Sequence, residues 1–222
     1  AIHGTLFIAG CTLAGYALAI MIDRGVRAEG FFRTVFMLPL SMSFIVTGLI
    51  WQWMLNPVFG IQDAVRDLGW EGFVFNWIVR PDRAIYTLAI AGIWQQVGLC
   101  MALFLAGLRG VDPNVWKAAR IDGIPTWRVY TDIITPMLRP VFFTVFVLLS
   151  ALVMKSFDLV VALTGGGPGF ASDLPARFVV DHILNRQELG LGAAGAFMML
   201  CTVVAVIGPY LYREIHKSRG AR

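Results

Sequence analysis

Charged residues are scarce in this sequence. Only 14% of its 222 residues are Asp, Glu, Lys or Arg, whereas 58% are hydrophobic. A water-soluble globular domain has about 25% charged residues, so this chain lacks the polar surface that such a domain needs. The mean hydropathy of +0.72 agrees with that conclusion. The shortage of charge predicts a protein that is surrounded by a lipid bilayer.

Residues that usually carry catalysis or bind metals are also few. The three cysteines lie in apolar runs without the spacing of a metal site, and the three histidines are scattered. No Ser/His/Asp arrangement can be recognised. A GxxxxGK[ST] phosphate-binding loop is missing, because the glycine triplet at 165–167 is followed by proline and no lysine stands at the required position. The sequence therefore predicts no catalytic residue, metal site or bound cofactor in this chain, and argues against an enzyme.

Long apolar runs dominate the chain instead. A membrane-spanning helix needs about 20 mostly apolar residues, and five stretches reach that length: 1–22, 34–55, 84–108, 141–164 and 189–212. They lack the alternating pattern of barrel strands, and the connectors are too short for a folded soluble domain. We predict an all-α polytopic membrane helical bundle, with 1–222 as a single transmembrane domain. The first run has neither a basic leader nor a cleavage site, so we expect it to be a span, preceded by one further span.

The basic residues are distributed unevenly between the connectors. Twelve of the Lys and Arg residues lie in 23–33, in 109–140 and after 212, against five in 56–83 and 165–188. The positive-inside rule then predicts that 23–33, 109–140 and the C-terminus face the cytoplasm. This alternation from one side of the membrane to the other explains the net charge of +4 without a nucleic-acid partner.

The longest cytoplasmic interruption, 111–140, has the pattern of a helical elbow. Asp112 followed by Pro113 is typical of a helix start, and Gly123 is typical of a left-handed helix end. A second helical pattern follows, which we expect to end at Pro136 and Pro140. It would carry four residues on one common side: Trp127, Tyr130, Ile133 and Ile134. Taken alone, this composition would also suit an elbow that rests on the bilayer surface.

Two of the apolar runs contain polar side chains at the depth of the membrane. Trp94, Gln95 and Gln96 lie near the middle of the third run, and the amides must hydrogen-bond either to a neighbouring helix or to a polar solute in a cavity. Lys155 and Asp158 lie three residues apart in the fourth run, where they either neutralise each other along one helical face or face water. A secondary transporter could use this pair as a proton relay, although we find no internal repeat and fewer spans than such transporters usually have.

Several stretches of the chain resemble the permease subunits of ATP-binding-cassette importers. Within the elbow, the paired alanines Ala118 and Ala119, Gly123 after three intervening residues, and the downstream Ile133 and Pro136 resemble their coupling-loop signature. The longer sequence PNVWKAARIDGIPTW is similar to the carbohydrate-uptake branch. GFFRTVFMLPLSMSFIVTGLIWQWMLNP at 30–57 and ALTGGGPGFASDLP at 162–175 extend the resemblance, which is strongest to permeases for glucose, mannose and glucosides.

This resemblance implies a particular assembly. A second permease subunit would complete the pathway, two cytoplasmic ATPase subunits would bind ATP and Mg, and an external binding protein would deliver a sugar, all within membrane lipid. The elbow at 113–136 would couple to the ATPase through six residues: Lys117, Ala118, Ala119, Asp122, Gly123 and Pro136. Lys117 departs from the family pattern, which has glutamate before the paired alanines, so its charge is reversed.

The resemblance also implies contacts for the sugar and the binding protein. The expected external contact is the glycine-rich loop Gly165, Gly166, Gly167 and Pro168. Asp158 would accept hydrogen bonds from sugar hydroxyls while Phe157 or Trp94 stacks on the sugar ring. The full expected sugar-pathway set is Trp94, Gln95, Gln96, Lys155, Phe157 and Asp158.

Overall fold

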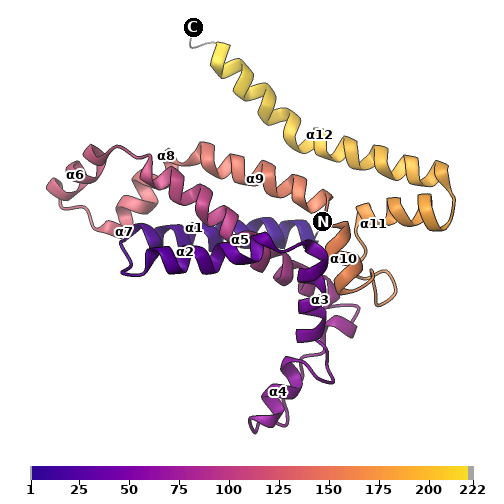
Figure 1. Ribbon diagram of the computed structural model, residues 1–222. Coiled ribbons are helices and arrows are strands. Elements are labelled where there is room, and N and C mark those ends of the chain that lie inside the picture. Colours follow the sequence, from indigo (N-terminus) through magenta and orange to yellow (C-terminus); the bar gives the residue numbers. More distant parts are fainter. Residues whose placement is uncertain (1, 220–222) are drawn as a thin grey trace. The chain divides into compact units, whose positions relative to one another are not determined.

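The computed structural model is built from helices (Figure 1). It describes the backbone of residues 2–219 and the side chains of 2–205 and 208, and this part of the chain contains no strand. The twelve α-helices are α1 (Ile2–Asp23), α2 (Glu29–Met37), α3 (Phe44–Met54), α4 (Ile61–Asp67), α5 (Ala84–Arg109), α6 (Pro113–Ile121), α7 (Thr126–Arg128), α8 (Thr135–Met137), α9 (Arg139–Met154), α10 (Phe157–Leu163), α11 (Pro175–Val180) and α12 (Leu189–Arg219). The predicted all-α class is confirmed.

Two compact units make up the fold. The first comprises 1–43 and 89–149, and the second comprises 44–88 and 150–222. Small residues allow the helices of the first unit to approach closely, as is common in membranes. A Cβ atom on Gly15 of α1 would lie 3.0 Å from the backbone nitrogen of Met101 in α5. On Gly98 of α5, it would overlap the backbone carbonyl group of Phe36 in α2.

An aromatic cluster joins three helices of the first unit. The ring of Tyr16 in α1 lies 5.2 Å from that of Phe104 in α5 and 5.0 Å from that of Phe142 in α9, centroid to centroid, and the two phenylalanine rings are 4.6 Å apart. At the ends of α2 and α5, Arg109 and Glu29 form an ion pair of 2.6 Å. The first unit is therefore held by apolar packing along its length and by charge at one end.

Helix pairs also form the second unit. A Cβ atom on Gly48 of α3 would lie 2.6 Å from the Cβ of Ala162 in α10, so these helices nearly touch. Gly192 and Gly195 of α12 are buried against Ile183 and Phe178, respectively. These two glycines therefore serve close packing within the chain. Within the connector 165–188, residues 175–185 are helical.

Two expected spans are continuous helices and two are broken. α1 and α5 are long and apolar enough to cross a membrane, which confirms runs 1–22 and 84–108 as candidate spans. The run 34–55 breaks at Met42, whose backbone is extended. The run 141–164 breaks at Lys155 and Ser156, between α9 and α10. Two bent helix pairs, Glu29–Ser41 with Phe44–Met54 and Thr126–Met137 with Arg139–Met154, are also long and apolar enough to cross a membrane if each is taken as one span, which gives up to four candidate spans among the described residues. The apolar part of α12 within those residues, Leu189–Ala205, is shorter than a span.

Hydrogen bonds explain why the break at Met42 is tolerated. A chain that leaves the helix in an apolar environment must still satisfy its free carbonyl groups. The Gln95 side chain in α5 donates from Nε2 to the carbonyl oxygen of Met42 at 2.8 Å, and the Ser41 hydroxyl donates to the carbonyl of Leu38 at 2.7 Å. The predicted interhelical role of a mid-span amide is therefore met by Gln95.

Candidate functional site: the elbow and the broken helices

The first arm of the elbow, α6, begins and ends where its sequence predicts. The Asp112 carboxylate accepts a hydrogen bond from the backbone N–H of Asn114 at 2.8 Å, and Pro113 occupies the first turn. Gly123 has a φ of +66°, the left-handed conformation that side chains with a Cβ disfavour. Ala119 is buried, whereas Lys117, Ala118, Arg120, Ile121 and Asp122 are exposed. α6 therefore faces the protein on one side and leaves the other side bare.

The second arm is irregular in a way that the sequence did not reveal. It runs from α7 through a π-helical turn, Val129–Ile134, into α8. Tyr130 and Ile134 are buried as expected, but Trp127 is 58% exposed, so the predicted common side is wrong for that residue. The wider π-turn changes the angular spacing of successive side chains and makes Val129 the buried neighbour of Tyr130.

The prolines do not end this arm as expected. Pro136 lies within α8, and Pro140 lies in the first turn of α9, where a missing N–H costs nothing. The chain instead bends at Leu138, where the stretches 126–137 and 139–154 meet at 68°. The side chain of Leu138 is buried and contacts α5 near Gly107.

Two side-chain hydrogen bonds tie the elbow to α1. The Tyr130 hydroxyl donates to the Asp23 carboxylate at 2.9 Å. Thr135 donates to the carbonyl oxygen of Tyr130 at 2.6 Å, so the Tyr16 hydroxyl, 2.7 Å away, donates to Thr135. Burial and the neighbouring Asp23 raise the pKa of Tyr130 to about 12, so its hydroxyl stays protonated and donating even above the pH at which an ordinary tyrosine ionises. This anchor could not be predicted from the sequence, because its partners are more than 100 positions apart.

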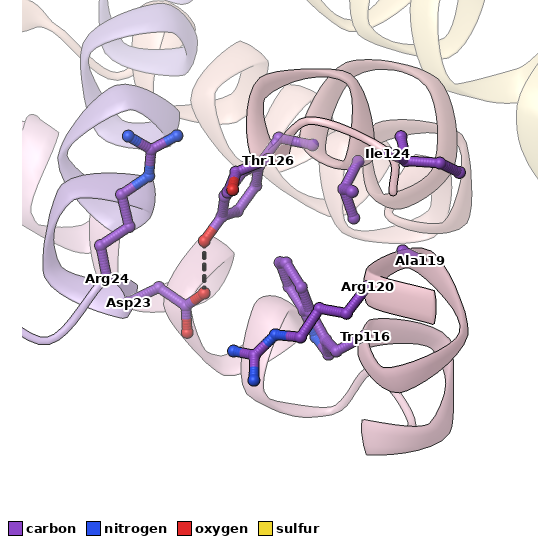
Figure 2. A pocket seen from close by; sticks show the side chains of 9 residues that line it. Asp23, Arg24, Trp116, Ala119, Arg120, Ile124 and Thr126 are labelled. Carbon is purple, nitrogen blue, oxygen red and sulfur yellow. Dashed lines mark hydrogen bonds between the residues drawn. The ribbon is translucent and has the colours of Figure 1, made fainter. Parts of the chain in front are cut away.

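A polar cleft of about 360 Å³ lies between the elbow and the end of α1. Figure 2 shows Arg24, after α1, and Arg120, from α6 with Trp116 beside it, on opposite sides of the hydrogen bond from Tyr130 to Asp23. The rings of Trp116 and Tyr130 pack edge to face at 5.2 Å between centroids. The guanidinium carbon of Arg24 lies 5.2 Å from the Tyr130 ring centre, within the range of a cation–π contact.

The expected sugar-pathway residues divide between the two units. Trp94, Gln95 and Gln96 belong to the first unit and 155–158 to the second. Gln95 and Gln96 are buried, and the Oε1 atom of each lacks a hydrogen-bond partner within the described structure. Trp94 is half-buried.

Lys155 and Asp158 do not share a helical face. Lys155 lies in the turn after α9, whereas Asp158 lies in the first turn of α10, so the helix break separates them. Both side chains are exposed, and no ion pair joins these two described residues. The intrahelical pair, one of the two arrangements that the sequence left open, is therefore not formed. The exposure of both side chains agrees with the other arrangement, in which they face water.

The glycine-rich loop is held in place by side chains beyond it. Ser172 is completely buried, and its hydroxyl lies 2.6 Å from the carbonyl oxygen of Gly167 and 2.7 Å from the Thr164 hydroxyl. The guanidinium of Arg177 lies where a side chain on Gly166 would need to be, and it forms an ion pair of 3.3 Å with Asp173. Sequence reasoning missed Ser172 and Arg177, which lie outside the glycine motif itself.

The structure is thus that of a helical protein with candidate membrane spans and a capped polar elbow. Residues 11–217 match the model of the family "binding-protein-dependent transport system inner membrane component", and this chain belongs to that family. It is thus a membrane-embedded permease subunit.

Curated relatives and solved structures agree with this family. The chain is 38% identical over 208 residues to a probable ABC transporter permease protein of Pyrococcus horikoshii, covering 93% of this chain and 71% of the relative. It is 36% identical over 206 residues to the xylose/arabinose import permease protein of Haloferax volcanii, covering 92% of this chain and 64% of the relative. A bacterial ABC transporter involved in the import of the acidic polysaccharide alginate is similar in structure, with a TM-score of 0.79 at 20% identity over 97% of this chain and 78% of that one. At that identity the similarity shows the fold alone.

Proposed function

We propose that this chain is one of two permease subunits of an ATP-driven sugar importer, and that residues 113–136 fit into a cytoplasmic ATPase subunit. The observation that carries the proposal is the two-sided elbow. Its inner side is tied to α1 through Tyr130 and Thr135, while its outer side is bare. A force applied to the outer side would reach the spanning helices through the inner one.

The outer side of α6 suits a protein partner. Ala118 leaves room for a close backbone approach, and the apolar side chain of Ile121 is 85% exposed. Lys117 adds a positive charge at the position where the coupling-loop pattern that the elbow resembles has glutamate. We therefore expect the ATPase cleft to present an apolar floor for Ile121 and an acidic residue for Lys117. Asp122, Gly123 and Pro136 complete the proposed contact, while the buried Ala119 supports it from behind.

The proposed substrate is a monosaccharide such as glucose or mannose, or a small glucoside. Relatives named for xylose and arabinose and for trehalose and maltose support a sugar, and the resemblance of 155–175 to glucose and mannose permeases supports the narrower choice. Asp158 is exposed and forms no hydrogen bond or ion pair with any other described residue, so its carboxylate is free to accept hydrogen bonds from sugar hydroxyls. Phe157 beside it is half-buried and offers a ring for stacking.

The other proposed sugar contacts have different support. Gln95 uses its Nε2 for Met42, and the Oε1 atoms of Gln95 and Gln96 are unpaired within the described structure. These oxygens would accept hydrogen bonds from a sugar only if the neighbouring side chains moved aside. Trp94 is proposed as a stacking ring, and Lys155 as a donor near Asp158.

On the external side, Gly165 to Pro168 is proposed to contact a sugar-binding protein. The buried Ser172 supports this role, because it fixes the loop in one shape. The proposed membrane is the cytoplasmic membrane of a bacterium or archaeon, with 23–33, 109–140 and the C-terminus inside. The basic side chains of the C-terminal tail, after residue 212, lie outside the described side chains.

Reconstitution of the whole complex tests this function. The permease pair, its ATPase subunits and the binding protein are purified together in lipid, and ATP hydrolysis is measured with a panel of monosaccharides and glucosides. We expect stimulation only when both the binding protein and the correct sugar are present. Sugar uptake by this chain without any ATPase subunit would contradict the proposal and support an ion-coupled transporter.

A further inference from the structure

The cleft behind the elbow has a feature that the proposed function does not use. Arg24 and Arg120 are both exposed at this cleft, and neither forms an ion pair with a described carboxylate. The one acidic side chain there, Asp23, already accepts the hydrogen bond of Tyr130. The lining residues therefore carry two positive charges and one negative charge, so the cleft has an excess positive charge.

The position of the cleft indicates which anion would reach it. Arg24 directly follows α1, a candidate span of 22 residues, so it lies at the level where a membrane ends. Tryptophan and tyrosine, here Trp116 and Tyr130, are typical of that interface. Phospholipid headgroups are the most abundant anions at this depth, and basic pockets between helices at the membrane surface bind them.

We propose that the phosphate group of an anionic phospholipid binds in this cleft, between Arg24 and Arg120. The planar guanidinium groups match the paired oxygens of a phosphate, and a volume of about 360 Å³ has room for a glycerophosphate headgroup. Arg24 belongs to the connector after α1 and Arg120 to α6, so the bound phosphate would link the elbow to the end of that helix. This link would add to the Tyr130–Asp23 hydrogen bond, and it goes beyond the proposed transport function.

Native mass spectrometry of the whole complex tests the proposal. The complex is prepared in nanodiscs of phosphatidylcholine with a minor share of phosphatidylglycerol, and retained phosphatidylglycerol is counted. Arg24→Gln and Arg120→Gln are each expected to lower its retention about tenfold, as for the loss of charge-assisted hydrogen bonds. Arg27→Gln is the matched control, because it removes the same charge from the same connector outside the cleft. We expect it to change retention less than twofold.

Further variants and ligands separate the alternatives. Arg24→Lys keeps the charge but not the paired donors, and partial retention by this variant would support the site even if the glutamine variants fold poorly. Equal losses of retained phosphatidylglycerol in Arg24→Gln, Arg120→Gln and Arg27→Gln would overturn the proposal. They would indicate that anionic lipid is attracted to the basic surface in general and not to this cleft. Stabilisation by inorganic phosphate without retained lipid would overturn the lipid source in favour of a soluble phosphate compound. Release of the ATPase subunits from the two cleft variants, with lipid unchanged, would overturn it in favour of an acidic protein side chain.

Discussion

The Tyr130 hydroxyl donates a hydrogen bond of 2.9 Å to the Asp23 carboxylate, across 107 positions of the sequence. It connects the arm after Gly123 to the last residue of α1. Any movement imposed on the elbow must therefore either move α1 or break this bond.

Replacing Tyr130 by phenylalanine should loosen the elbow. The variant keeps the ring that packs on Trp116 but leaves the Asp23 carboxylate without its donor, at a cost of about 1.5–3 kcal/mol. We expect ATP hydrolysis that is less dependent on sugar and slower transport in the reconstituted complex. Tyr86→Phe is the control, because the hydroxyl of Tyr86 makes no hydrogen bond among the described residues. Unchanged coupling in Tyr130→Phe would argue against transmission through α1.

Substituting Gly123 by alanine should strain the turn between the two arms. No atom lies within 4 Å of the added Cβ, so the cost comes from the backbone alone at a φ of +66° and is about 1–2 kcal/mol. We expect weaker copurification of the ATPase subunits at an unchanged amount of folded permease. Gly190→Ala adds a methyl group in equally open space within α12 without a positive φ and should have no such effect. If both variants behave alike, the left-handed turn is not needed for the contact.

The close approach of α5 and α2 predicts a larger effect on stability. A Cβ on residue 98 would overlap the Phe36 carbonyl group, so Gly98→Ala must push the helices apart, at about 1–3 kcal/mol. Thermal unfolding of the purified permease in detergent should occur at a lower temperature than in wild type. Gly30→Ala, in an open position of α2, should leave the midpoint the same or raise it.

Reversing the charge of Lys117 should weaken the proposed ATPase contact. Lys117→Glu would bring a carboxylate to the acidic residue that we expect on the ATPase, and less ATPase should copurify. If replacing that acidic residue of the ATPase by lysine restored copurification with the Lys117→Glu permease, the two residues would be identified as an ion pair. Arg27→Glu is the control, since it makes the same reversal on the same expected side but outside the elbow. A Lys117→Glu complex of normal composition and activity would contradict the predicted polarity.

Asp158 should matter for the sugar and not for assembly. Asp158→Asn removes the charged acceptor with little change of shape, so we expect a complex of normal composition whose sugar-stimulated ATP hydrolysis is about tenfold lower, as for one lost charge-assisted hydrogen bond. Lys155→Gln shows whether any loss of charge in this turn has the same result. Full stimulation of the Asp158→Asn complex would remove this residue from the sugar site.

Features encoded by neighbouring residues could be predicted from the sequence. The continuous helices α1 and α5 follow from apolar length, and both ends of α6 follow from Asp112, Pro113 and Gly123. The break at Met42 was missed, because the amide that satisfies its carbonyl comes from Gln95, 53 positions away. The exposure of Trp127 was missed because periodicity assumes an α-helix, whereas a π-turn follows at Val129.

The buried hydroxyl of Ser172 has a consequence for recognition at the glycine-rich loop. The carbonyl oxygen of Gly167 already accepts a hydrogen bond from Ser172, and Arg177 packs over Gly166. The glycine-rich loop is therefore restricted to few conformations before any partner binds. Binding of a protein to this loop would cost little conformational entropy of the loop. Shape complementarity, rather than the cost of ordering a flexible loop, would therefore determine which partner binds.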